Sequence, residues 1–187
     1  DFMLTNPPYG KSWKSDQKSI VDGKDVIDHR FQVNLSDYTG EDFDFYSAIP
    51  RSSDGQLLFM MEMVNKMKRL SDSPMGSRIA SVHNGSALFT GDAGSGESNI
   101  RRHIIENDYL EAIIQLPNNL FYNTGITTYV WILSNNKADK RKGKVQLIDA
   151  SGWWHKMRKS LGSKRKEMGA EHIALVSRLF GEFIEAE

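Results

Sequence analysis

The chain has 187 residues, of which 39% are apolar and 26% charged, and its 24 basic and 24 acidic side chains leave no net charge. This composition is typical of a soluble globular protein and excludes a disordered chain, and no apolar run approaches the ~20 residues of a membrane helix. The chain has no cysteine, which excludes disulfides, thiolate metal sites and a cysteine nucleophile. We therefore expect a cytoplasmic protein with no membrane partner.

The first third of the chain contains one clear strand and one long segment without periodicity. Residues 1–5 predict a strand that stops at two prolines, because a proline neither donates a backbone hydrogen bond nor continues a sheet ladder. Residues 11–51 are rich in Asp, Ser, Gly and Asn, and they predict a long excursion with one short helix near "EDFDFYSAI". Loops of this length in compact domains are commonly lids or binding loops.

The chain then alternates between helices and strands. Ser53 or Asp54 caps a predicted helix whose apolar side chains recur at helical spacing as far as Leu70. The last two predicted strands are joined by a short basic tip and are expected to form a hairpin. The further predicted elements are a strand at 78–84, a Gly/Ser-rich surface loop, a helix at 99–107, and strands at 110–117, 127–135 and 144–150.

This alternation is typical of a doubly wound α/β sheet. We expect residues 1–150 to form the later strands of a partial Rossmann-like fold with an antiparallel edge hairpin. Residues 151–187 are expected to be a basic linker followed by an amphipathic helix over 170–185. Because the chain opens in mid-strand, we expect it to be part of a longer polypeptide. Ligands of such sheets bind beyond the carboxyl ends of the strands, where residues 6–9 lie.

The segment "TNPPYG" after the first strand suits the binding of a planar amino group. Asn6 Oδ1 and the Pro7 carbonyl can accept both hydrogens of such a group and direct its lone pair outward. Tyr9, held by the stiff turn, offers a flat face to an unstacked base. The structural alternative is that Asn6 caps an ordinary turn and Tyr9 packs in the core.

"TNPPYG" also matches the (D/N/S)-P-P-(Y/F/W) motif of amino-group methyltransferases that use S-adenosylmethionine. Together with "RIASVHNGSALF", "IRRHIIENDYLEAIIQLPNNLFYNTGITTYVWILSNNK" and "VQLIDAS", the chain from residue 1 to about residue 173 resembles the modification (M) subunit of type I restriction-modification systems. The resemblance implies an adenine-N6 DNA methyltransferase, with double-stranded DNA, a specificity subunit, a second M subunit and a nuclease subunit as partners. Its catalytic turn would consist of Asn6, Pro7, Pro8 and Tyr9.

The resemblance also implies what this chain lacks. In the family the glycine-rich cofactor loop precedes the motif, and no G-x-G pattern follows a strand in this sequence. We therefore expect Asn6 to be this chain's contact with S-adenosylmethionine and the chain to be inactive alone. Phe121 matches a second aromatic placed against the flipped base, and Tyr122 is an equal candidate. Asparagine at position 6, where many cytosine-N4 enzymes have serine, favours adenine N6.

Other polar groups have less specific signals. Lys11, Trp13 and Lys14 follow the turn closely and are candidate DNA contacts, although an ordinary exposed loop explains them equally well. The basic segment around Trp153 and Trp154 either contacts phosphates or a partner subunit, which the resemblance favours, or is a solvated linker. The five histidines lack metal-ligand spacing, so no metal is expected.

Two rival functions remain open at this stage. The same four motif residues serve methyltransferases that act on a protein glutamine amide or on an amino group in RNA. The chain is alternatively a non-catalytic module that contributes DNA or subunit contacts while the chemistry takes place elsewhere.

Overall fold

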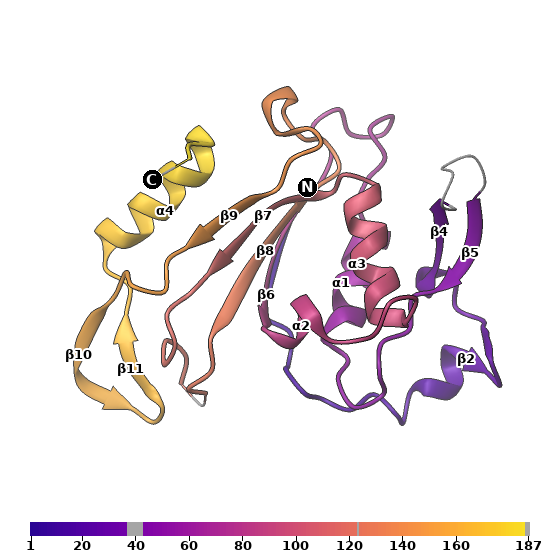
Figure 1. Ribbon diagram of the computed structural model, residues 1–187, viewed down its shortest axis with the longest axis horizontal. Coiled ribbons are helices and arrows are strands. Elements are labelled where there is room, and N and C mark those ends of the chain that lie inside the picture. Colours follow the sequence, from indigo (N-terminus) through magenta and orange to yellow (C-terminus); the bar gives the residue numbers. More distant parts are fainter. Residues whose placement is uncertain (37–42, 123, 186–187) are drawn as a thin grey trace.

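Five strands form a central sheet in the computed structural model, which describes residues 1–36, 43–122 and 124–185 (Figure 1). Four of the strands run in one direction, and β8 runs antiparallel to both of its neighbours. The carboxyl ends of the four parallel strands therefore share one edge of the sheet, which we call the carboxyl edge. The strands, in their order across the sheet, are β1 (Phe2–Thr5), β6 (Arg78–Asn84), β8 (Thr128–Ser134), β7 (Leu110–Gln115) and β9 (Gln146–Asp149).

Helices cover the first face of the sheet and form the main core with it. Positions along β6 alternate between buried and half-exposed, because one face of this strand points at the helices. Ile79 of β6 and two helical side chains, Met60 and Ile104, are fully buried there, and burial of each contributes about 1.5–3 kcal/mol. The helices on this side are α1 (Gln56–Asn65), which ends short of the predicted Leu70, α2 (Ser86–Phe89) and α3 (Gly96–Glu106).

Gly96 begins α3 at a point of close backbone approach. A Cβ atom added at Gly96 would lie 1.7 Å from the carbonyl oxygen of Ile49, so no side chain fits at this position. One turn further along, the Asn99 side-chain amide donates to the Ser47 carbonyl at 2.9 Å. The predicted helix at 99–107 therefore begins earlier than its apolar pattern indicates, and its first turn fixes the chain that leads into α1.

The second face of the sheet is covered by α4 (Ala170–Glu182), which confirms the amphipathic helix predicted near the end of the chain. Its apolar side pairs Leu179 and Phe180 with Ile114 and Ile148 of the sheet. Both faces of β7 are thereby covered, which explains its nearly continuous apolar sequence. No helix of the described residues is both long and apolar enough to span a membrane.

The segment between β1 and α1 is not the irregular loop with a short helix that its composition predicts. The stretch expected to be helical contains strand β5, which pairs antiparallel with β4, and residues 37–42 lie outside the described residues. Val33 and Leu35, at alternate positions of β4, are buried in the main core. Burial of this strand favours pairing with β5 over the weak helical pattern of the β5 segment. The elements are η1 (Gln17–Ser19), β2 (Val21–Asp22), β3 (Asp25–Val26), η2 (His29–Phe31), β4 (Gln32–Ser36) and β5 (Phe43–Ser47).

The predicted hairpin of β8 with β9 is wrong in its pairing. β8 pairs antiparallel with β6 and β7, whereas β9 pairs in parallel with β7. The chain reverses direction between the end of β7 and the start of β8, and Trp131 and Leu133 of β8 are buried in the main core. The α/β class is confirmed, but the antiparallel strand β8 is an interior strand of the sheet and not an edge strand.

The basic tract after β9 is a β-hairpin and not an irregular linker. β10 (His155–Leu161) pairs antiparallel with β11 (Lys164–Glu167), and the pairing register shifts between Lys156 and Leu161. Figure 1 shows this hairpin beside the sheet at the lower left, between β9 and α4 in the chain. A 3-10 turn, η3 (Asp139–Arg141), precedes β9 at the end of the sheet opposite the carboxyl edge.

The strand β1 pairs on one side only among the described residues, with β6. Its alternate side chains Phe2 and Leu4 are 78% and 82% exposed. Strand β1 is therefore both an edge strand and an apolar surface.

Candidate active site

The two-proline turn leaves the sheet where the sequence predicts, at the carboxyl edge. β1 ends at Thr5, Asn6 is exposed, Pro7 is buried and Tyr9 is half-buried. The Tyr9 hydroxyl donates a hydrogen bond to Asn6 Oδ1, and burial raises the pKa of this hydroxyl, so it remains a donor at neutral pH. The turn therefore presents the Asn6 amide to solvent with the Tyr9 ring beside it.

The turn is fastened to the segment that leads into α1. The Gly10 N–H donates to Asp54 Oδ1 at 3.2 Å, and the Gly55 N–H donates to the Lys11 carbonyl at 3.0 Å. Gly10 has a φ of 61°, a conformation that glycine adopts without strain. Backbone hydrogen bonds therefore hold the chain on the carboxyl side of Tyr9 in a fixed position.

Trp13 is part of this attachment and is buried, whereas both sequence interpretations, a DNA contact and an ordinary exposed loop, place it at the surface. Its side chain is only 6% exposed, and its indole N–H donates to the Arg51 carbonyl at 2.9 Å. The ring joins the main core because the 10–13 segment turns inward onto residues 51–55. Lys11 and Lys14 are both exposed, and their contact with DNA stays a prediction.

A buried polar network, which the sequence analysis did not predict, connects to the motif turn. Asp54 Oδ2 accepts from Gln56 Nε2 at 2.7 Å and from Ser86 Oγ at 3.2 Å. Gln56 Nε2 also lies 2.8 Å from Asn84 Oδ1, and Gln56 Oε1 accepts from the Asn84 N–H at 3.3 Å. The network joins the motif turn through Asp54 to the carboxyl end of β6. Its only sequence signals are the cap-type Asp54 and the Asn84-Gly85 pair, which indicate ordinary caps and turns.

Gln56 is the centre of this network, and its loss is expected to destabilise the protein. Gln56 is 2% exposed, and its Oε1 accepts from the Asn84 N–H and faces the buried His83 Nδ1. Gln56→Leu leaves both groups without this acceptor, at a cost of about 1–3 kcal/mol. Urea unfolding measures this cost. The matched control is Asn65→Ala at the exposed end of the same helix, which should change stability by less than about 0.5 kcal/mol. Equal effects of both changes would contradict a central role for Gln56.

His83 lies fully buried on the inner side of β6, next to Gln56. Burial lowers its pKa to about 4, and the charge of Asp54 acts weakly in the opposite direction. Its Nδ1 is 3.2 Å from Gln56 Oε1, which only accepts, so the neutral ring carries its proton on Nδ1. The ring also meets Trp131 edge to face, with the ring centres 5.8 Å apart.

The buried neutral state of His83 predicts a loss of stability in mild acid. The unfolded chain binds a proton near pH 6.5 and the folded chain only near pH 4, so stability is fully present above 6.5 and falls between these values by about 2–3 kcal/mol. Urea unfolding at pH 7 and pH 5 checks this, since carboxylates with lowered pKa values stay ionised in that window. His103, whose pKa burial also lowers, adds to the same trend. The comparison with His83→Gln isolates His83, and an equal pH dependence in both proteins would refute the prediction.

The two aromatic candidates of the 116–127 loop differ in exposure. Phe121 is half-buried and packs against the second apolar cluster, whereas Tyr122 is 60% exposed. The loop leaves the carboxyl end of β7 and so lies on the same edge of the sheet as the motif turn. The fold therefore presents Tyr122 to solvent and uses Phe121 in packing.

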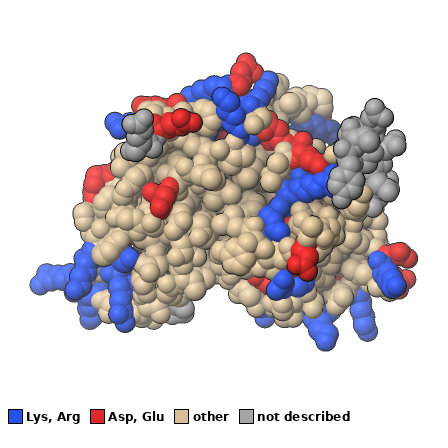
Figure 2. Space-filling view, in the orientation of Figure 1, with Lys and Arg blue, Asp and Glu red and all other residues tan. Residues whose placement is uncertain are grey.

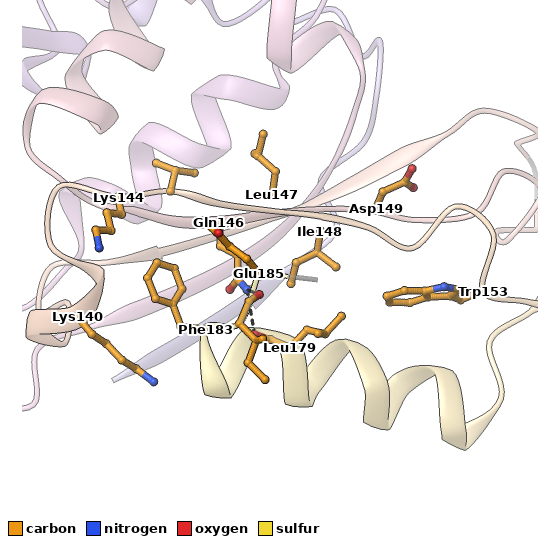
Figure 3. Close-up of a pocket in the computed structure, with 12 residues that line it drawn as sticks. Lys140, Lys144, Gln146, Leu147, Ile148, Asp149, Trp153, Leu179, Phe183 and Glu185 are labelled. Carbon is orange, nitrogen blue, oxygen red and sulfur yellow. Dashed lines mark hydrogen bonds between the residues drawn. The ribbon is translucent and has the colours of Figure 1, made fainter. Parts of the chain in front are cut away.

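Two other groupings lie away from the motif turn. A cavity of about 1230 Å³ lies between β9 and α4, and no motif residue lines it. Figure 3 shows its lining residues, which include Ile148, Trp153 and Phe183. His155 and His172 come together with Glu171, with one potential metal-ligand atom of each within 4.8 Å of the others. This grouping was not anticipated from the sequence, and hydrogen bonds from His155 to Glu171 and from the Gly169 N–H to His172 Nδ1 account for it.

The Gly/Ser-rich segment does not form a cofactor loop in the described chain. It follows helix α2 and ends in the first turn of α3, whereas a dinucleotide-type loop follows a strand directly. Asn6 is exposed at the carboxyl edge, and its contact with a cofactor stays a prediction.

Comparison with known proteins identifies the family. The chain matches the N-6 DNA Methylase family over residues 1–187. It is 41% identical over 151 residues to the methylase subunit of the type I restriction enzyme HindI of Haemophilus influenzae, covering 80% of this chain and 27% of that protein. It is 24% identical over 188 residues to the MjaIX methylase subunit of Methanocaldococcus jannaschii, covering 100% of this chain and 29% of that protein.

A solved structure has the same fold. The type I restriction-modification system methyltransferase subunit of Streptococcus thermophilus matches with a TM-score of 0.72 and 24% identity, covering 100% of this chain and 32% of that chain. The chain thus spans less than a third of the length of each of these relatives. By its match along the whole sequence, the chain belongs to the N-6 DNA Methylase family.

Proposed function

We propose that the chain is the target-base half of the methylase subunit of a type I restriction-modification system, which methylates adenine N6 in double-stranded DNA. The observation that carries the proposal is the exposed Asn6 amide, held beside the Tyr9 ring at the carboxyl end of β1, in a chain of the N-6 DNA Methylase family. The 41% identity to a type I methylase subunit supports the choice of DNA over a protein amide or RNA.

In the proposed reaction the turn binds the amino group of an adenine flipped out of the duplex. Asn6 Oδ1 and the Pro7 carbonyl accept its two N–H hydrogens, so the nitrogen lone pair is directed away from them. Tyr9 stacks on the base and fixes its plane. S-adenosylmethionine would supply the methyl group: the amino nitrogen would form a bond to the methyl carbon as the sulfonium S–CH3 bond breaks, S-adenosylhomocysteine would leave, and the nitrogen would then lose one proton to solvent. The rate gain from this chain is orientation and charge stabilisation, with no covalent intermediate to the protein.

The hydrogen bond within the turn defines the resting state of this site. The Tyr9 hydroxyl uses one of the two acceptor positions of Asn6 Oδ1 when no base is bound. An incoming amino group therefore replaces or shares this bond, which keeps the Asn6 amide ordered before the base arrives.

Cofactor and partner assignments extend the proposal to the whole subunit. We assign residues 1–150 to the later half of the catalytic domain, and α4 to the start of the region that contacts other subunits. The cofactor-binding half, the specificity subunit, a second methylase subunit and the nuclease subunit would lie outside this chain, so this part alone would be inactive. The proposed location is the cytoplasm, where the DNA is.

The proposal is tested by the identity of the methylated product. The full-length subunit, coexpressed with its specificity subunit, is incubated with plasmid DNA and labelled S-adenosylmethionine, and the digested DNA is analysed as nucleosides. Label in N6-methyladenine is the expected result. Label in protein or RNA with unlabelled DNA would instead assign the motif to another amino-group substrate, and no label in any of them would favour a non-catalytic module.

A further inference from the structure

We propose that the β10–β11 hairpin binds backbone phosphates of the DNA duplex beside the target base. This inference rests on the proposed function, because it takes the duplex to be the substrate of the Asn6 turn. The sequence leaves open whether the basic tract contacts DNA or a protein subunit, and the proposal assigns it to DNA.

The hairpin carries a dense and uncompensated positive charge. Residues 155–167 contain six Lys or Arg side chains and one acid. None of the six forms an ion pair with any residue that the structure describes, whereas other basic groups, such as Arg30 and Arg78, have acidic partners. Figure 2 shows a blue group of Lys and Arg side chains at the lower left, where Figure 1 places the hairpin. Four of the six basic side chains are exposed, whereas Lys164 and Lys166 are half-buried, and Lys166 Nζ lies 4.0 Å from the centre of the Trp154 ring. Exposed cations of one sign on a single element, without acidic partners among the described residues, are suited to phosphates. The six are Lys156, Arg158, Lys159, Lys164, Arg165 and Lys166.

The hairpin has too little apolar surface for a typical protein interface. Along β10 only Met157 is half-buried, and the other positions are exposed and mostly polar. Leu161, at the tip, is the large apolar side chain that the hairpin exposes, at 50%. The centres of protein interfaces are depleted in charge and enriched in aromatic residues, whereas DNA interfaces are polar and basic. These features favour DNA over a protein subunit.

The hairpin is fixed to the loop that follows β7. The N–H groups of Arg165 and Lys166 donate to the Asn119 carbonyl at 2.9 and 3.2 Å, and the Ser163 N–H donates to the Tyr122 carbonyl at 2.9 Å. Asn119 Nδ2 donates in return to the Ser163 carbonyl at 3.1 Å. Hydrogen bonds therefore attach the hairpin to the loop that carries the exposed Tyr122.

The hairpin and the Asn6 turn lie at the same edge of the sheet. β1 and β9 run in the same direction, so both the turn and the chain that leads into β10 leave the sheet at the carboxyl edge. Four strand spacings separate β1 from β9, which is a distance of roughly 20 Å or about six base pairs along a duplex. A duplex with its target base in the turn would thus run across the carboxyl edge within reach of the hairpin.

The experiment compares two charge-neutralised variants of the full-length subunit in complex with its specificity subunit. The test variant carries Lys156→Gln, Arg158→Gln and Lys159→Gln on β10. The control carries Arg69→Gln, Lys142→Gln and Lys144→Gln, which remove the same charge from exposed positions at the opposite edge of the sheet. Affinity for duplex DNA is measured as a function of salt concentration, and assembly of the complex is followed by sedimentation.

The expected result is a test variant that binds any duplex at least about tenfold more weakly and whose slope of log K against log salt is smaller by about 2–3, with the complex still assembled. The control should change neither quantity. An unchanged slope would overturn the proposal, and loss of the specificity subunit from the test variant would assign the hairpin to a subunit contact instead. The binding assay does not depend on methylation. A wild-type complex that makes no N6-methyladenine would therefore refute the proposed function, while the DNA-binding comparison would still test the hairpin proposal.

Discussion

Replacing Asn6 with alanine in the full-length subunit is expected to lower turnover by about 10²–10³-fold, with DNA affinity nearly unchanged. The Asn6 amide accepts from the amino group most strongly as that nitrogen becomes positive, so its loss raises the barrier and not the dissociation constant. The Asn6 side chain is exposed, and within the described part of the chain it bonds only to Tyr9, so its replacement should leave the fold intact. Single-turnover methylation and DNA binding, measured on the same protein, separate the two effects.

Two further variants sharpen this test. Asn6→Asp keeps an acceptor oxygen and is expected to retain more activity than Asn6→Ala. Asn65→Ala removes an exposed asparagine far from the turn and should leave activity at the wild-type level. Full methylation by Asn6→Ala would remove Asn6 from the reaction.

Replacing Tyr9 with alanine is expected to lower kcat/KM by about 10–100-fold, because stacking of a base on an aromatic ring contributes about 1–3 kcal/mol. Tyr9→Phe keeps the ring and removes only the hydroxyl that donates to Asn6 Oδ1. We expect this variant to stay within a few-fold of wild type, since the amino group of the base supplies a replacement donor.

The fluorescence of 2-aminopurine at the target position reports base flipping directly. A flipped base that stacks on Tyr9 is quenched, whereas in Tyr9→Ala it should become brighter. If Tyr9→Phe and Tyr9→Ala lose equal activity, the hydroxyl and not the ring is the important group, and the stacking role is wrong.

The sequence predicts the position of the motif turn well because that position depends on local chemistry. Pro7 and Pro8 end β1 wherever the rest of the chain lies, and the resulting turn lies at the end of the strand. The pairing of β8 and β9 depends instead on burial across the whole sheet. Two strands that follow one another in the sequence and are joined by a short tip, as β8 and β9 are, resemble a hairpin. The apolar side chains of β8 are buried, however, when this strand lies between β6 and β7.

The support of the turn could not be predicted for the same reason. Asp54, Gln56 and Asn84 are separated by up to 30 residues, and each has an ordinary local role as a cap, a helix residue or a turn residue. Trp13 next to two lysines indicates a surface segment, yet the ring is buried because the chain folds back onto residues 51–55. Both features depend on contacts between distant segments, which local patterns do not encode.

The open edge of β1 has a practical consequence for work with this part of the chain alone. An edge strand with free backbone groups and exposed Phe2 and Leu4 is a template on which further strands can add. Self-association of the isolated piece would therefore begin at β1, far from the charged hairpin. A polar or charged substitution at Leu4 is therefore expected to raise the solubility of such preparations.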